Sequence, residues 1–331
     1  MKGRVKASFA GALAFCLLLS GMALSDVNAA NAIDTSAKCS VEFHAPTEDG
    51  FGELNNLEIP VFLYKVADVD VSGKYSSLEA FQELGLEQVN SETTAKEWEE
   101  KAEKAYAVIA GNEDQADGEE NHKIQPIPQT ASIKNGLGTA TEIPVGMYLV
   151  VAETVQSPEY EYSFNPYLLA LPNNYYYSNQ TDDWVYDVKG ASLKPEKKER
   201  YGSLVIDKTL KTYNATLGRA TFVFQVEGKK TDGTAYSNVA SIVFDQAGTA
   251  SVRLDQIPAG MEVTVKEVYS GASYELDSNE EVTAKIVADE EAHVGFSNEH
   301  NGKMNGGASV VNHFTKNEKE YWDVTQIPDT K

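Results

Sequence analysis

The sequence predicts a mainly β protein built from two tandem β-sandwich domains, the first of which carries a helical insertion. Short apolar segments separated by Gly, Pro, Asn and Asp clusters recur along most of the chain, which is typical of β-sandwiches. One stretch is written twice, as IPVGMYLVVAET at 143–154 and as IPAGMEVTVKEV at 257–268. The 331 residues, of which 42% are hydrophobic, are enough for about two domains of roughly 150 residues each.

The first 29 residues predict a secretory signal peptide that is not part of the fold. MKGRVK is a basic n-region, FAGALAFCLLLSGMAL is an apolar h-region, and VNA ends at Ala29 as a small-residue cleavage site. Cys16 lies inside this segment, so the mature chain keeps one cysteine, Cys39, and has no internal disulfide. We therefore expect a secreted protein that is stabilised by packing or by another kind of cross-link.

Residues 30–193 predict the first domain. CSVEFHA and EIPVFLYKVADV are its first strands, and GMYLVVAET, SFNPYLLALP and DWVYDVKGASL are its later ones. Between them we expect two helices, a short one over SSLEAFQEL and a longer one over TTAKEWEEKAEKAYAVIAG. Thr94 and Glu97 have the spacing of a capping box for the longer helix, whose apolar residues share one face.

The charged segment 194–200, KPEKKER, marks a linker to the second domain at 201–318, and a tail follows at 319–331. Beyond the linker the chain reads as short strands with even spacing: GSLVIDKTL, ATFVFQVEG, VASIVFDQAG, TASVRLDQ, MEVTVKEV, AKIVADEE, AHVGFSNE and ASVVNHFT. This pattern predicts an all-β sandwich.

The charge and the motif content of the sequence exclude several functional classes. The formal net charge is −22, with no Lys/Arg-rich patch to offset it, so nucleic acid is not expected as a partner. The five histidines show no metal-ligand spacing, and no phosphate loop or nucleophile elbow is present. The sequence therefore predicts no enzyme, cofactor or metal centre.

Each copy of the repeated stretch ends its apolar alternation with a carboxylate, Glu153 in the first and Glu267 in the second. In the second domain, Lys208 ends the first strand and Asn312 lies on the last, and both have apolar neighbours on alternate positions. Burial lowers the pKa of a lysine and raises that of a carboxyl group, so a buried pair tends toward a neutral amine and an acid. We therefore expect Lys208 to attack the Asn312 side chain with Glu267 as the acid, unless Lys208 and Glu267 lie instead on the solvated strand face.

The segments GSLVIDKTL, FDQAGTASVRLDQIPAGMEVTVKEV and ASVVNHF resemble the Ig-like CnaB-type domain of Gram-positive pilins and adhesins. In that family an internal Lys–Asn isopeptide bond forms beside a catalytic acid. Over residues 201–318, the resemblance implies Lys208 and Asn312 as the bonded pair and Glu267 as the acid. The first domain has no lysine or asparagine in the places that correspond to Lys208 and Asn312. We therefore expect Glu153 either to be satisfied by hydrogen bonds or to be a remnant of an ancestral plan that the two domains share.

The first domain also resembles the N-terminal domain of major pilins, through IPVFLYKVADVDVSGKY, IPVGMYLVV and DWVYDV. Those pilins carry a linkage lysine in a motif whose Tyr-Pro-Lys core is absent here. Lys194, which precedes Pro195, is the nearest candidate for an intersubunit linkage, and Lys189 is the second. At the C-terminus, IPDT at 327–330 resembles the start of a sortase signal, with Thr330 as the residue to be linked; Lys331 replaces its glycine.

A calcium loop is a weaker alternative for DVDVSGKYSSLE. Asp68, Asp70, Ser72 and Glu79 have the spacing of calcium ligands, but the flanking helix pair is missing and Asp-x-Ser-Gly is also ordinary turn chemistry. Taken together, the residues and the resemblance predict a secreted cell-surface or cell-wall protein, a pilus backbone subunit or adhesin. Its partners would be other pilin subunits, a sortase, and host or matrix ligands. The alternative is a carbohydrate- or matrix-binding surface protein that uses the sandwiches as spacers.

Overall fold

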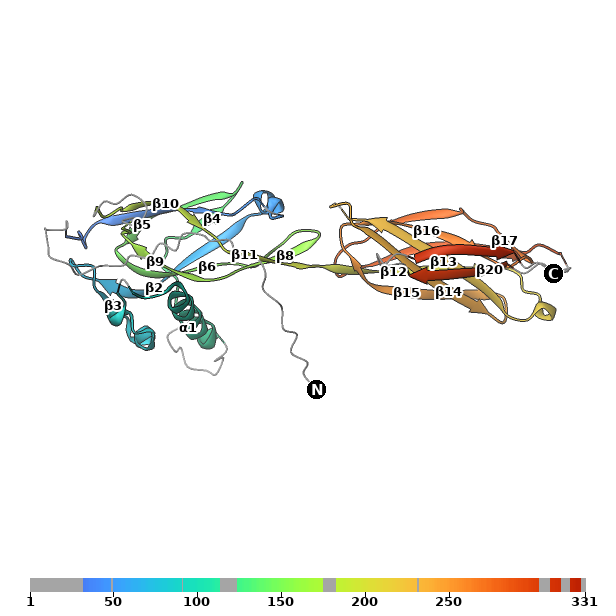
Figure 1. Ribbon diagram of the computed structural model, residues 1–331, viewed down its shortest axis with the longest axis horizontal. Helices are drawn as coiled ribbons and strands as arrows, with labels where there is room; N and C mark the ends of the chain where they lie inside the picture. Colours follow the sequence, from blue (N-terminus) through green and yellow to red (C-terminus); the bar gives the residue numbers. More distant parts are fainter. Residues whose placement is uncertain are drawn as a thin grey trace. The chain divides into compact units, whose positions relative to one another are not determined.

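The protein is mainly β, with the described residues assigned to two units (Figure 1). The structure is a computed structural model that describes residues 32–48, 50–90, 92–113, 124–174, 183–230, 232–303, 310–316 and 322–328. Unit 1 comprises Met1–Val155 with Ser163–Glu196, and unit 2 comprises Gln156–Tyr162 with Lys197–Lys331. The expected signal peptide, 1–29, lies outside the described residues. None of the helices in the described part of the chain has the length and apolarity needed to cross a bilayer.

Unit 1 contains two sheets, of order β10-β1-β5 and β3-β2-β6-β9, with β4 paired to β2. Its elements are β1 (Lys38–His44), η1 (Gly52–Asn56), β2 (Ile59–Val69), β3 (Tyr75–Ser77), η2 (Glu79–Leu84), η3 (Leu86–Gln88), α1 (Ala95–Glu113), β4 (Ala131–Ile133), β5 (Leu137–Pro144), β6 (Gly146–Ala152), β9 (Tyr167–Leu171) and β10 (Asp187–Ser192). A further sheet has the order β11-β8-β7, formed by β7 (Val155–Gln156), β8 (Tyr160–Phe164) and β11 (Pro195–Glu199).

The helical insertion is confirmed for its longer part. The Thr94 hydroxyl accepts a hydrogen bond from the Glu97 amide at 3.3 Å, and the Glu97 carboxylate accepts one from the Thr94 amide at 2.6 Å, so the expected capping box begins α1. The apolar face of α1 is buried. The shorter predicted helix is instead a pair of 3₁₀ segments, η2 and η3, separated by Gly85 in the left-handed region at φ 59°.

Strand β6, which holds the first copy of the repeated stretch, is buried on both faces. Met147 and Leu149 pack in one cluster with residues of α1, including Trp98. Tyr148 and Val150 point to the opposite face, because successive side chains alternate across a strand, and they are buried as well. The helical insertion therefore covers a face of this sheet that would otherwise meet solvent.

Unit 2 is a sandwich of two four-stranded sheets, of order β15-β12-β19-β17 and β14-β13-β16-β18 (Figure 1). Its elements are β12 (Tyr201–Leu210), η4 (Ala215–Leu217), β13 (Ala220–Lys229), β14 (Ala235–Phe244), β15 (Gly248–Pro258), β16 (Glu262–Tyr269), β17 (Tyr274–Leu276), β18 (Glu281–Lys285), β19 (Glu291–His300), β20 (Val310–Lys316) and β21 (Trp322–Pro328). The last two strands pair with each other in a separate sheet.

One hydrophobic core joins the two sheets of unit 2. Leu204 and Ile206 of β12 share it with Phe222 of β13, Val265 of β16 and Phe296 of β19. Strand β12 lies between β15, its antiparallel neighbour, and β19, its parallel neighbour. The first strand of this sandwich thus runs beside a strand from its far end in sequence, and both direct alternate side chains into the same interior.

Candidate functional site

Three polar side chains meet inside the apolar core of unit 2. Lys208 comes from β12 and Asn298 from β19, which are neighbours in one sheet, whereas Glu267 comes from β16 in the opposite sheet. Period-two alternation explains their direction, since Leu204 and Ile206 precede Lys208 on the inner face of β12, and Val263 and Val265 precede Glu267 on β16. The predicted meeting of Lys208 and Glu267 is present in the structure.

The three side chains form a closed hydrogen-bond triangle. The Lys208 amine donates to Glu267 Oε2 at 2.5 Å and also to Asn298 Oδ1. The Asn298 amide nitrogen donates to Glu267 Oε1 at 2.7 Å. One carboxylate therefore contacts both nitrogen atoms, with a different oxygen for each.

The backbone holds each member of the triangle in place. Asn298 is paired with Leu210 on one side and with Leu276 of β17 on the other. Glu267 pairs with Phe224 at a bulge, where β16 carries one extra residue relative to β13. Bulges redirect side chains next to active sites, so this irregularity helps to set the direction of the carboxylate.

The triangle is sealed from solvent. The exposed fractions of the side chains are 0% for Lys208 and 2% for Glu267, and Asn298 is 0% exposed as a residue. Burial lowers the pKa of the Lys208 amine, and this effect outweighs the hydrogen bond and the charge of Glu267, which raise it. Burial thus shifts the Lys208 amine, which lies beside an amide carbonyl, in the direction of its neutral, nucleophilic form.

The asparagine that contacts Lys208 is Asn298, whereas the sequence pointed to Asn312. Asn312 lies on β20, where it pairs with Gln326 of β21, and this hairpin is a sheet of its own. Its side chain is outside the described ones. Strands β19 and β20 each carry an asparagine two positions from a phenylalanine, so that the two side chains share a face. The local sequence pattern therefore does not distinguish Asn298 from Asn312. The signal that selects Asn298 is the parallel pairing of β12 with β19, which is a long-range feature.

Glu153 does not occupy the equivalent place in unit 1. It follows the end of β6 and is exposed, so it is not a counterpart of the buried Glu267. Met147 and Leu149, which match the core residues Met261 and Val263 in the repeat, face the α1 cluster. The inner positions of β1, which pairs with β10 as β12 pairs with β19, are apolar: Cys39, Val41 and Phe43.

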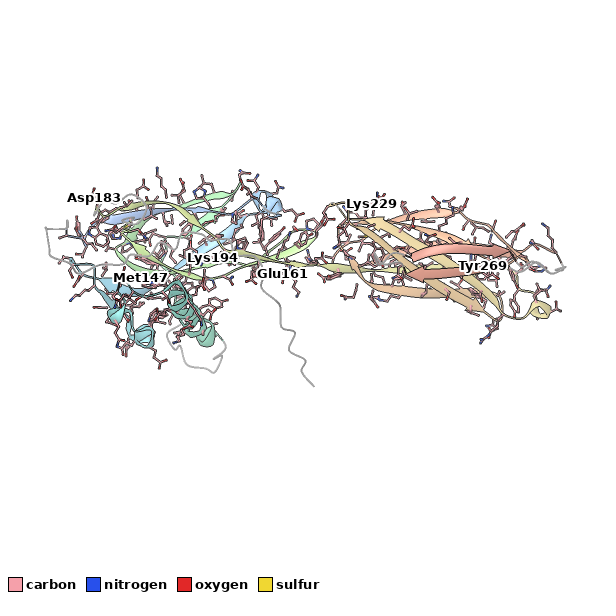
Figure 2. All side chains as sticks on the ribbon, in the orientation of Figure 1. Met147, Glu161, Asp183, Lys194, Lys229 and Tyr269 are labelled. Atoms are coloured by element: carbon pink, nitrogen blue, oxygen red, sulfur yellow. The ribbon has the colours of Figure 1, made fainter. Side chains whose placement is uncertain are left out.

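The lysines predicted for intersubunit linkage lie on the surface of unit 1. Lys194, just before β11 (Figure 2), has a 40% exposed side chain and an ion pair with Glu99 of α1 at 3.5 Å. Lys189 on β10 is 70% exposed and lies 3.9 Å from Asp187. Thr330 is outside the described residues. Linkage through Lys194 or Lys189 stays a prediction.

The residues with calcium-loop spacing form a hairpin turn between β2 and β3. Asp70 accepts hydrogen bonds from the amides of Ser72 and Lys74, and Gly73 takes φ 86°. Asp68 pairs with Lys65 at 2.5 Å, and Glu79 begins η2. Ordinary turn chemistry therefore accounts for Asp70 and Ser72, and their hydrogen bonds hold the pKa of Asp70 below its usual value.

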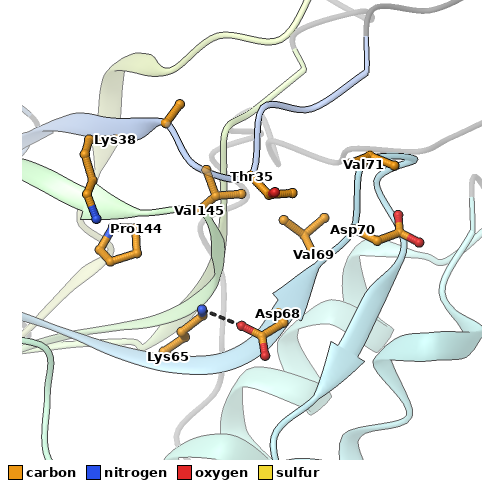
Figure 3. A pocket seen from close by; sticks show the side chains of 10 residues that line it. Thr35, Lys38, Lys65, Asp68, Val69, Asp70, Val71, Pro144 and Val145 are labelled. Atoms are coloured by element: carbon orange, nitrogen blue, oxygen red, sulfur yellow. Dashed lines mark hydrogen bonds and ion pairs between the residues drawn. The ribbon is translucent and has the colours of Figure 1, made fainter.

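An open hollow of about 470 Å³ lies beside this turn (Figure 3). Its lining includes Thr35, Lys38, Val71 and Pro144, together with the Lys65–Asp68 ion pair. The lining holds no aromatic side chain on which a sugar ring could stack.

A family model matches part of unit 2. Residues 204–301 match the model of a domain of unknown function, DUF5979. This segment contains Lys208, Glu267 and Asn298 and ends before Asn312. No curated protein matches the chain.

The solved structures similar to this chain include Gram-positive pilins. The minor pilin GBS52 of Streptococcus agalactiae is 13% identical, over 82% of this chain and 100% of that one, with a TM-score of 0.23. The basal pilin SpaE of Lactobacillus rhamnosus GG is 12% identical, over 79% and 99%, with a TM-score of 0.28. The TIE protein of Bacillus anthracis is 12% identical, over 88% and 43%, with a TM-score of 0.33. With TM-scores below 0.5, these likenesses carry no functional argument.

Proposed function

We propose that this protein is a non-enzymatic structural subunit of the cell surface, of the pilin or adhesin type, whose unit 2 locks itself with a Lys208–Asn298 amide bond. The observation that supports the proposal is the sealed triangle of Lys208, Glu267 and Asn298. An unreacted buried lysine and glutamate are costly to the fold, since burial of charge is repaid only with excellent geometry. Conversion of the amine into an amide removes that cost permanently.

The chemistry follows from the contacts. Glu267 Oε2 takes a proton from the Lys208 ammonium, and the neutral amine attacks Cγ of Asn298, so that a C–N bond forms. The attacking nitrogen then loses one proton and keeps the other. The carboxyl group delivers a proton to the Asn298 amide nitrogen, which Oε1 contacts, and the old C–N bond breaks. Glu267 takes up the second proton, which the attacking nitrogen has lost, and passes it to the departing ammonia, so that ammonium leaves and the Glu267 carboxylate is regenerated.

Proximity replaces an external catalyst. The amine and the carbonyl oxygen of Asn298 are already in hydrogen-bond contact, and neither side chain is free to leave the packed interior. The bond would join β12 directly to β19 and so prevent these strands from separating under tension. A fibre or surface subunit without disulfides gains mechanical resistance in this way.

Intact mass spectrometry of the purified chain tests the proposal. We expect a mass lower than that of the sequence by one ammonia. The variants Lys208→Ala, Glu267→Ala and Asn298→Ala should each restore the full mass, because each removes the nucleophile, the proton carrier or the electrophile.

Two matched substitutions serve as controls. Asn312→Ala and Glu153→Gln should keep the deficit, since neither side chain belongs to the triangle. A wild-type chain at full sequence mass would refute the cross-link. A deficit that disappears in Asn312→Ala and persists in Asn298→Ala would return the bond to the asparagine that the sequence first indicated.

A further inference from the structure

Two phenylalanine rings of β13 face the Lys208 amine in the core of unit 2. The Phe222 ring centroid lies 4.5 Å from Lys208 Nζ, and that of Phe224 lies 5.8 Å away. Phe222 is fully buried, and its ring makes edge contacts with Phe244 at 5.7 Å and with Tyr274 at 5.8 Å. The ring nearer to the amine is thus held in a fixed orientation by two other rings.

The contact has a consequence for the reaction as well as for packing. The face of an aromatic ring attracts a cation, and the attraction strengthens where water is excluded. When a neutral amine attacks a carbonyl carbon, positive charge develops on the nitrogen until a proton leaves. Relative to the neutral amine, a ring face over Nζ therefore stabilises the charged nitrogen that forms on attack, while it also confines the amine to the side of the core where Asn298 and Glu267 lie.

We infer that Phe222 is a positioning residue for cross-link formation, which keeps the Lys208 amine against the Asn298 carbonyl and stabilises the charge that develops on the attacking nitrogen. This inference rests on the proposed function. Phe222 gives the cleaner test than Phe224, because Phe224 pairs with Glu267 across the strands and a change there also disturbs the acid.

The chain offers a matched control for the loss of the ring. Phe244 is buried at 6% exposure in the same cluster, and its ring makes a T-shaped contact with that of Phe222. Among the described residues, the ring faces found over the Lys208 amine belong to Phe222 and Phe224. Phe222→Leu and Phe244→Leu therefore remove the same atoms from the same core, and only the first uncovers the amine.

The experiment follows the reaction from its start. The full chain is made by cell-free translation, samples are quenched in denaturant, and mass spectrometry measures the fraction that has lost one ammonia. Protease resistance gives the folded fraction, to which each rate is normalised. We expect Phe222→Leu to react about tenfold more slowly than wild type, Phe244→Leu to react at nearly the wild-type rate, and Phe222→Tyr, which keeps the ring face, to recover most of the rate.

The outcomes separate this inference from the proposal beneath it. Wild type that never loses ammonia overturns the cross-link, and the role of Phe222 with it. Wild type that reacts, with equal normalised rates for Phe222→Leu and Phe244→Leu, overturns the role of Phe222 alone. Phe222→Met is a second variant without a ring, for use where leucine prevents folding, because methionine adapts to irregular core space. It is expected to be as slow as Phe222→Leu, and a wild-type rate in Phe222→Met overturns the inference.

Discussion

Lys208 is the residue on which the proposed chemistry of unit 2 depends. A lysine with no solvent exposure is rare unless it is paired, and here its partners are a single carboxylate and a single amide. Burial lowers the pKa of its amine. Before the amide forms, the folded chain therefore binds the Lys208 proton less tightly than the unfolded chain does.

This difference predicts a pH dependence in Asn298→Ala, where the bond cannot form and the amine stays buried. Between the lowered pKa of Lys208 in the folded state and its ordinary value of 10.5, the unfolded chain binds the extra proton. The free energy of unfolding should therefore rise with pH in that window, by at most about 1.4 kcal/mol per pH unit. Denaturant unfolding followed at several pH values measures the slope.

The matched control for this slope is Asn298→Ala combined with Lys208→Met, which keeps the length of the side chain and removes the titrating group. The difference between the two variants reports on Lys208 together with Glu267, which contacts its amine, and cancels the ionisable groups that do not contact this pair. Below the lowered pKa the difference should be independent of pH, because both states are then protonated. A difference that is also flat up to pH 10.5 would show that burial leaves the amine unperturbed.

The sequence predicted two of the three residues in the site. Apolar alternation before Lys208 and Glu267 was enough to direct both side chains inward, because strand periodicity is a local property. The third residue depended on which late strand lies beside β12. Asn298 and Asn312 both occupy apolar strands, and the choice between them is made by parallel pairing over about 90 residues, which periodicity does not encode.

At the scale of elements, the two copies of the repeated stretch share a corner in the backbone next to the Ile-Pro pair, whereas their glutamates lie in different environments. Glu142 and Gln256 precede the two Ile-Pro pairs, and each takes φ 59°. Each lies where β5 or β15 shifts register against its antiparallel neighbour, β1 or β12. The isoleucine that follows is fully buried in both copies. Beyond this corner the copies diverge, because the helical insertion adds a second buried face to β6.

The left-handed residue at this corner predicts a stabilising substitution in unit 2. Gln256 is exposed, so its side chain contributes little packing, while an L-residue in this region costs about 1–2 kcal/mol. Gln256→Gly removes that strain, but part of the gain in stability is lost because glycine loses more conformational entropy on folding than other residues do. We expect the free energy of unfolding to rise by about 0.5 kcal/mol, measured by denaturant titration in the Lys208→Ala background. Gln256→Ala keeps the strain and should give no gain.

At the scale of the whole molecule, the two units use different means of stabilisation. Unit 1 extends its core with a helical insertion on one face of a sheet, and among its described residues no lysine–glutamate–asparagine triangle occurs. The described residues of unit 2 include no helical insertion of this kind, and they bury the Lys208–Glu267–Asn298 triangle instead. The proposed bond would close a loop of about 90 residues, from β12 to β19, and the hairpin of β20 and β21 would lie outside that loop.

The size and position of this loop predict which unit is destabilised when the bond is absent. In the loop-entropy treatment of cross-links, closure of about 90 residues restricts the unfolded chain by roughly 4–5 kcal/mol. Lys208→Ala should therefore lower the transition of unit 2 in calorimetry of the full chain and leave that of unit 1 in place, because Lys208 is enclosed by residues of unit 2. Lys194→Ala, a lysine change of the same kind in unit 1, should not move the transition of unit 2. A closed loop constrains only the chain between its ends. Equal shifts of both transitions in Lys208→Ala would therefore contradict this account, because the bond would then act beyond the unit that contains it.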